Sequence, residues 1–176
     1  METSLIFTMP SGSVEIKPLD DQKLFDLARE LGIRSQDFII VLEELLINCQ
    51  EHGDGIASMQ YAVADDLFIF RLSDRGSGIH RSIPRNPRLS DTLGKASSSI
   101  LRLALEEGIT GTGQIGRGMG LSLLSQFVRR SSTEAIIASD HGCVTQQGDR
   151  FSECILQKDV LGTVVLLKVA RSDVGA

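Results

Sequence analysis

Two polar side chains four residues apart, Glu44 and Asn48, interrupt an apolar helical pattern and could act on a nucleotide. Residues at positions i and i+4 project from the same face of a helix, here displaced from the stripe of Leu45 and Cys49. A carboxamide oxygen is a hard ligand suited to Mg²⁺, and a carboxylate one turn away can accept a proton from an attacking hydroxyl group or water. Taken alone, a solvated polar stripe explains this spacing about equally well.

A second candidate group follows a hydrophobic strand pattern, where Asp74 precedes Gly76 and Gly78 in the segment SDRGSGI. An ionised carboxylate only accepts hydrogen bonds, so Asp74 could bind the exocyclic amine of adenine and reject the carbonyl of guanine. The two glycines would let the base approach the backbone closely. A turn that closes the strand is the alternative interpretation, because Asp and Gly are ordinary turn residues.

The third candidate is the segment GRGMGL, residues 116–121, which leads into another helical pattern. Unpaired backbone N–H groups at a helix N-terminus favour phosphate, and Arg117 could add a charge-assisted hydrogen bond. Gly111, Gly113 and Gly116 also have the G-x-G-x-x-G spacing, but the dinucleotide-binding fingerprint requires a strand directly before it, whereas a helix is predicted there. No G-K-[S/T] sequence is present, so we predict a phosphate-binding loop of neither the Rossmann nor the Walker A type.

Hydrophobic periodicity predicts the elements that position these residues. Helices are expected at about 20–31, 36–52, 95–107 and 120–130, and strands at 5–8, 13–17, 59–63, 67–72, 135–138, 143–146, 151–156 and 163–169. Asp65 and Asp66 would form the turn of a hairpin whose second strand ends at Asp74. The segment from about 79 to 118 contains two prolines and several arginines and ends in closely spaced glycines, a composition typical of a mobile lid.

Length and composition narrow the classes of protein to consider. With 176 residues, of which 41% are hydrophobic, one domain covering residues 1–176 is expected. The net charge of −5 argues against a nucleic-acid-binding surface. No apolar stretch is long enough for a membrane span, no signal peptide is evident, and the three cysteines match no disulfide or metal-binding pattern. We therefore expect a soluble protein in the cytoplasm, without a membrane or nucleic-acid partner.

In this order, the three segments resemble the GHKL ATPase superfamily of gyrase, the large heat-shock chaperone, histidine kinases and MutL. EELLINCQEHG resembles its N box, SDRGSGI its G1 box and GRGMGL its G2 box. The fold implied is a two-layer α/β sandwich (the Bergerat fold), with helices on one face of a mixed sheet. Leu161-Gly162-Thr163 resembles the late Gly-Thr of the family, whose hydroxyl group supports the aspartate that binds adenine.

The resemblance implies a role for each matching residue, with ATP and Mg²⁺ as cofactors. Glu44 would be the general base, Asn48 the metal ligand and Asp74 the acceptor of the adenine amine. The remaining nucleotide-binding residues would be Gly76, Gly78, Ile79, Gly116, Arg117, Gly118, Met119, Gly120, Leu121 and Thr163.

Within the superfamily, the chain most resembles the stand-alone anti-sigma-factor serine kinases. His52, His80 and His141 are the only histidines and lie within or after the N box, so no upstream phosphoacceptor histidine is present. The resemblance implies a protein serine/threonine kinase whose partner is a STAS-like protein or a sigma factor. An ATP-gated binding module with little turnover and a plain ATPase are the alternatives. Two arrangements are left open for the strand at 5–8. It could pair with its copy in a homodimer, or its edge could be covered by its own domain.

Overall fold

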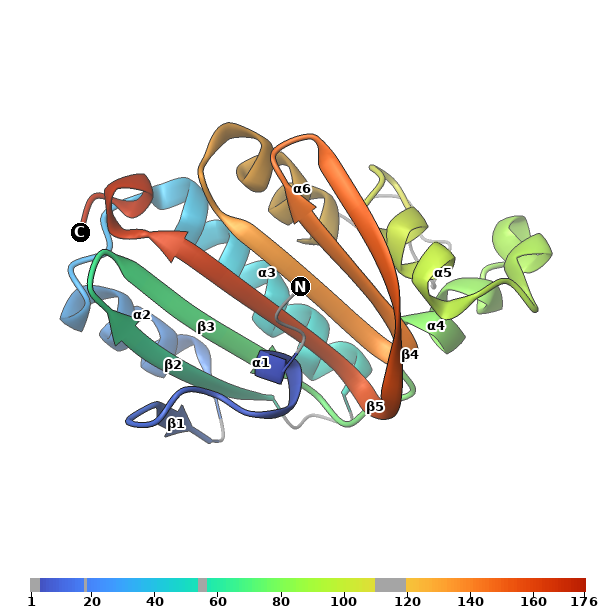
Figure 1. The fold of residues 1–176 in the computed structure, drawn as a ribbon, viewed down its shortest axis with the longest axis horizontal. Coiled ribbons are helices and arrows are strands. Elements are labelled where there is room, and N and C mark those ends of the chain that lie inside the picture. The colour runs from blue at the N-terminus through green and yellow to red at the C-terminus, as the bar shows by residue number, and fades with distance from the viewer. Residues whose placement is uncertain (1–3, 18, 54–56, 110–119) are drawn as a thin grey trace.

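One sheet forms the centre of the fold, and the computed structural model describes residues 4–17, 19–53, 57–109 and 120–176 around it (Figure 1). Its strand order is β1–β2–β3–β5–β4, and each of the four pairings between these strands is antiparallel. The strands are β1 (Val14–Ile16), β2 (Ser58–Ala64), β3 (Leu67–Ser73), β4 (Glu134–Gln147) and β5 (Arg150–Ala170). The predicted α/β class is confirmed. The sheet was expected to be mixed, but its strand pairings in the described residues are antiparallel.

Three long helices cover one face of the sheet (Figure 1): α2 (Asp21–Glu30), α3 (Gln36–His52) and α6 (Gly120–Arg130). The side chain of Asp20 accepts a hydrogen bond from the N–H group of Lys23, and that of Ser35 accepts one from Phe38, so these two residues cap the N-termini of α2 and α3. The main hydrophobic core lies between these helices and the sheet. Its largest fully buried side chains include Phe38, Phe68 and Phe70.

The segment that follows Asp74 folds as short helices at one end of the sheet. These are α4 (Ile79–Ser82), η1 (Ile83–Arg85), η2 (Pro87–Thr92) and α5 (Ser97–Ala104). Here α5 packs closely on β4, because Gly142 has no side chain to keep the backbone of Ser97 and Ser98 away. The predicted lid covers residues 79–118. The structure describes residues 79–109 of it, and residues 110–118 lie outside the described part of the chain. The lid function stays a prediction.

The opposite face of the sheet carries a smaller apolar cluster, beneath the N-terminal segment. The strand predicted at residues 5–8 is absent, because residues 5–7 belong to helix α1 (Ser4–Phe7). This expectation was wrong, and pairing of such a strand across a two-fold axis is excluded with it. A short apolar run has no decisive periodicity, and burial of Ile6 against this face decides its conformation.

The four strands predicted after residue 134 are two long ones, β4 and β5, and η3 (Arg171–Val174) follows them. The polar residues around Ser139 lie between two separately predicted strands, at 135–138 and 143–146. Instead, the ladder continues past them through register shifts at Asp140, which adopts a φ of 54°. Bulges of this kind bend a strand without ending it.

Among the described residues, no helix has the length and apolarity needed to cross a membrane.

Candidate functional site

Asp74 lies where β3 ends, immediately beside β5. Its backbone N–H donates to the carbonyl oxygen of Thr163, at 3.1 Å between N and O, so the ladder between the two strands extends to this residue. The residue is only 7% exposed. A carboxylate buried to this degree must be supported by hydrogen bonds, because transfer of an unpaired charge out of water is costly.

The Asp74 carboxylate is held by donors from both flanking segments. Its Oδ1 atom accepts from the backbone N–H of Gly76 at 2.8 Å and from that of Thr163 at 3.3 Å, and the Thr163 side chain also hydrogen-bonds to it. Burial raises the pKa of Asp74, while these hydrogen bonds and the nearby His52 partly offset the rise. A carboxylate has about four acceptor positions, so these three donors leave room for an amine from a ligand.

Glycines allow three backbone segments to meet at Asp74. A Cβ atom on Gly53 would overlap the Asp74 side chain, and one on Gly76 would overlap the carbonyl oxygen of His52. A Cβ on Gly162 would overlap the backbone oxygen of Asp74. The end of α3, the segment after β3 and the bend in β5 are therefore in contact around one carboxylate.

Glu44 and Asn48 lie on the same face of α3, as predicted, and both are half-buried. This face carries the start of α6: a Cβ atom on Gly120 would overlap Nδ2 of Asn48 and would lie 3.4 Å from Cβ of Glu44. Gly116, Arg117, Gly118 and Met119, which were predicted to bind phosphates, lie outside the described residues.

The two ends of the predicted site are connected through the C-terminal turns of α3. Cys49, next to Asn48, has its pKa raised to about 12 by burial and by the negative charge of Asp74. Asp74 itself touches Gly53, little more than one turn beyond Asn48. The structure thus brings Glu44, Asn48 and Gly120 to one part of α3, and Asp74, Gly76 and Thr163 to its end.

The remaining predicted residues lie between these two groups and the short helices. Ile79 and Leu121 are partly buried and pack against the same small apolar cluster, which consists of Ile83, Ile100 and Ala104. Gly78 has a φ of 78°, and a Cβ atom there would overlap Oγ of Ser139. One apolar cluster on η1 and α5 thus joins Ile79, at the end of the segment SDRGSGI, to the start of α6.

Sequence analysis missed Ser139 and His80, which support the bend in β5. The hydroxyl group of Ser139 donates to the carbonyl oxygen of Gly162 at 2.8 Å, and Nδ1 of His80 lies 3.0 Å from the same hydroxyl oxygen. Burial lowers the pKa of His80, which favours the neutral ring. Because Ser139 lies 23 residues from Gly162 in the chain, no local pattern could have indicated this contact.

A second polar group lies farther along the β4–β5 hairpin. Ligand atoms of Asp140, His141 and Asp159 lie within 4.8 Å of one another. The ion pair between His141 Nε2 and Asp159 Oδ1, at 2.7 Å, and the hydrogen bond from Ser97 to Asp140 account for this arrangement.

Neither models of known protein families nor curated protein sequences match the chain.

Proposed function

We propose that this chain is an Mg-ATP-binding regulatory protein of the GHKL type, acting as a protein serine/threonine kinase. The observation that carries the proposal is Asp74: a buried carboxylate at a strand end, held by Gly76 and Thr163 and beside the helix that bears Asn48. Its remaining acceptor position suits the adenine amine. The resemblance of the three sequence segments supplies the rest of the assignment.

Triphosphate and metal would lie between α3 and the start of α6. Asn48 offers a carboxamide oxygen, and Mg²⁺ accepts a single protein ligand together with phosphate oxygens and water. The backbone N–H groups that begin α6 at Gly120 would favour phosphate. When bound, Mg²⁺ would neutralise negative charge on the phosphates.

Asn48→Ala should weaken ATP binding in the presence of Mg²⁺ about tenfold and leave binding without Mg²⁺ nearly unchanged, because only the metal contact is removed. Calorimetric titration of both proteins with ATP, with and without Mg²⁺, measures this difference. Gln50→Ala removes an exposed amide from the same helix and is the matched control. Equal Mg²⁺ dependence in wild type and Asn48→Ala would contradict the metal-ligand role.

Glu44 would accept the proton of a serine or threonine hydroxyl group as its oxygen attacks the γ-phosphorus and ADP leaves. Glu44→Gln should lower the rate of phosphoryl transfer about 10²- to 10⁴-fold with ATP affinity retained, because a carboxamide is not a base. The assay is label transfer from ATP to a STAS-like protein encoded beside this chain, with Glu43→Gln as the control. ATP binding without transfer by wild type would contradict the kinase assignment.

An ATP-gated binding module is the second candidate, and the position of the short helices favours it. Ile79 begins α4 five residues after Asp74, and α4 and α5 pack with Leu121 at the start of α6. A nucleotide that contacts both segments could bias the arrangement of these helices and so the surface offered to a STAS-like protein or a sigma factor. Partner affinity that changes with ATP, without label transfer, would favour this function; steady phosphate release without a partner would favour a plain ATPase.

A further inference from the structure

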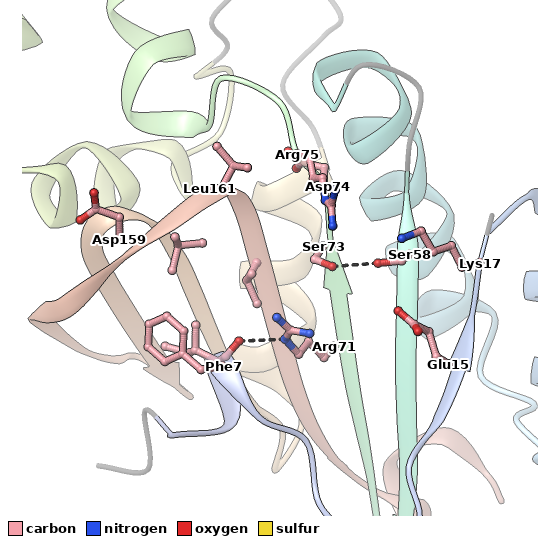
Figure 2. Close-up of a pocket in the computed structure, with 13 residues that line it drawn as sticks. Phe7, Glu15, Lys17, Ser58, Arg71, Ser73, Asp74, Arg75, Asp159 and Leu161 are labelled. Atoms are coloured by element: carbon pink, nitrogen blue, oxygen red, sulfur yellow. Dashed lines mark hydrogen bonds between the residues drawn. The ribbon is translucent and has the colours of Figure 1, made fainter.

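A cavity of about 540 Å³ lies on the face of the sheet opposite the long helices. Figure 2 shows its labelled side chains converging from the N-terminal segment, β1, β2, β3 and β5. Its volume is in the range of small-molecule sites. The cavity reaches the end of β3 but contains neither Glu44 nor Asn48, so it is distinct from the proposed metal and phosphate positions.

Arg71 is held rigidly in this cavity. Its Nε atom donates to the carbonyl oxygen of Ile6, and its Nη1 atom donates to Oε1 of Gln60, both at 2.8 Å. The residue is half-buried, and burial lowers its pKa from a very high ordinary value, so it stays protonated. A guanidinium group has five N–H donors, and the two anchoring hydrogen bonds leave others for a ligand.

Three cationic and three carboxylate side chains line the cavity. Lys17 and Arg75 also line the cavity, are exposed, and form no ion pair with any carboxylate in the described part of the chain. Of the three carboxylates, Asp159 pairs with His141, and Asp74 accepts hydrogen bonds from its own neighbours. Lys17 and Arg75, which have no carboxylate partner among the described residues, and the spare N–H groups of Arg71 therefore favour an anionic ligand.

The other polar and apolar groups fit the same ligand. The hydroxyl oxygens of Ser58 and Ser73 lie 2.9 Å apart, and since only one of these hydroxyl groups donates to the other, the second keeps a hydrogen to offer (Figure 2). Two apolar side chains at the cavity, Phe7 and Leu161, are 43% and 72% exposed. They provide a surface for the organic part of a ligand.

We infer that this cavity is a second binding site, for a small organic phosphate monoester. Its phosphoryl group, which carries about 1.5 to 2 negative charges at neutral pH, would contact Arg71, Lys17 and Arg75. Its apolar group would pack against Phe7 and Leu161. This site is independent of the proposed nucleotide site, although Asp74 borders both.

Phenyl phosphate is the probe, titrated calorimetrically into the full chain with and without saturating ADP and Mg²⁺. Wild type should bind it saturably in both conditions, and the double variant Lys17→Gln/Arg75→Gln should bind it at least about tenfold more weakly. Both replaced side chains are exposed, so the variant should keep the fold, which thermal unfolding verifies. Arg150→Gln, which removes one positive charge at the distant β4–β5 turn, is the control and should bind like wild type.

Three results would overturn the inference: no saturable binding of phenyl phosphate, equal binding of uncharged phenol, or unchanged affinity in the double variant. Displacement by ADP would also overturn it, because the probe would then occupy the nucleotide site. If ADP itself does not bind, the proposed function fails while the phenyl phosphate result still decides this site.

Discussion

Asp74→Asn should lose about 1–3 kcal/mol of ATP-binding free energy, which corresponds to a dissociation constant roughly five- to 150-fold larger. The carboxylate accepts only, whereas an asparagine that still accepts from Gly76 and Thr163 turns an amide N–H₂ group towards the remaining acceptor position. Two donors, this amide and the adenine amine, would then face each other. Titration with ATP and with GTP measures the loss, and unchanged ATP affinity would remove Asp74 from the site.

The same substitution should leave the unliganded protein as stable as wild type, or more stable, at neutral pH. Burial raises the pKa of Asp74, so the ionised form costs folding free energy above that pKa. As the pH falls through the raised pKa towards the unfolded value of about 3.9, the folded protein takes up the proton first and this cost disappears. Any advantage of the asparagine variant should therefore shrink between neutral pH and about pH 4.

Thermal unfolding of both proteins across this pH range tests the second half of the prediction. A variant that is less stable than wild type at neutral pH would mean that the carboxylate is a structural element. If the variant loses ATP affinity but its melting temperature is not lowered, Asp74 serves binding and not stability.

Gly162→Ala should unfold the site and cost about 3 kcal/mol of stability or more. Gly162 has a φ of 73°, a region that costs an L-residue about 1–2 kcal/mol. In addition, an added Cβ atom would overlap the backbone oxygen of Asp74, and relief of such overlap costs about 1–3 kcal/mol. Because β5 would have to move from β3 at this point, ATP affinity should fall together with the melting temperature.

Gly148→Ala is the matched control for this prediction. Gly148 has a φ of 56°, but a Cβ atom there would meet no other atom within 4 Å. The control variant should therefore lose only the conformational part, about 1–2 kcal/mol, and bind ATP like wild type. Equal destabilisation of the two variants in chemical denaturation would show that close packing on Asp74 contributes nothing.

Local sequence patterns correctly predicted the elements whose stabilising interactions lie within a few residues. The helical stripe of α3 and the hairpin turn at Asp65 were both expected from short stretches of sequence, because the interactions involved span only a few residues. Glu44 and Asn48 share a helix face for the same reason.

Where distant residues decide the outcome, the same patterns failed. Residues 5–8 were predicted as a strand, but Ile6 is buried against the open face and its carbonyl oxygen accepts from Arg71, 65 residues away. The predicted break near Ser139 is a bulge within β4, since its polar side chain is satisfied by Gly162 on the neighbouring strand. Neither partner is visible from the local sequence.

By itself, the sequence determined which residues could do chemistry and which helix face or strand end carries each of them, because helical and strand periodicity act over a few residues. The family resemblance led us to expect Thr163 beside Asp74, 89 residues away, whereas the contact of Gly120 with Asn48 and the position of Arg71 at a cavity on the other side of the sheet appear only in the folded chain. These contacts depend on the order and register of antiparallel strands and on close packing at glycines, which arise when the whole chain is folded.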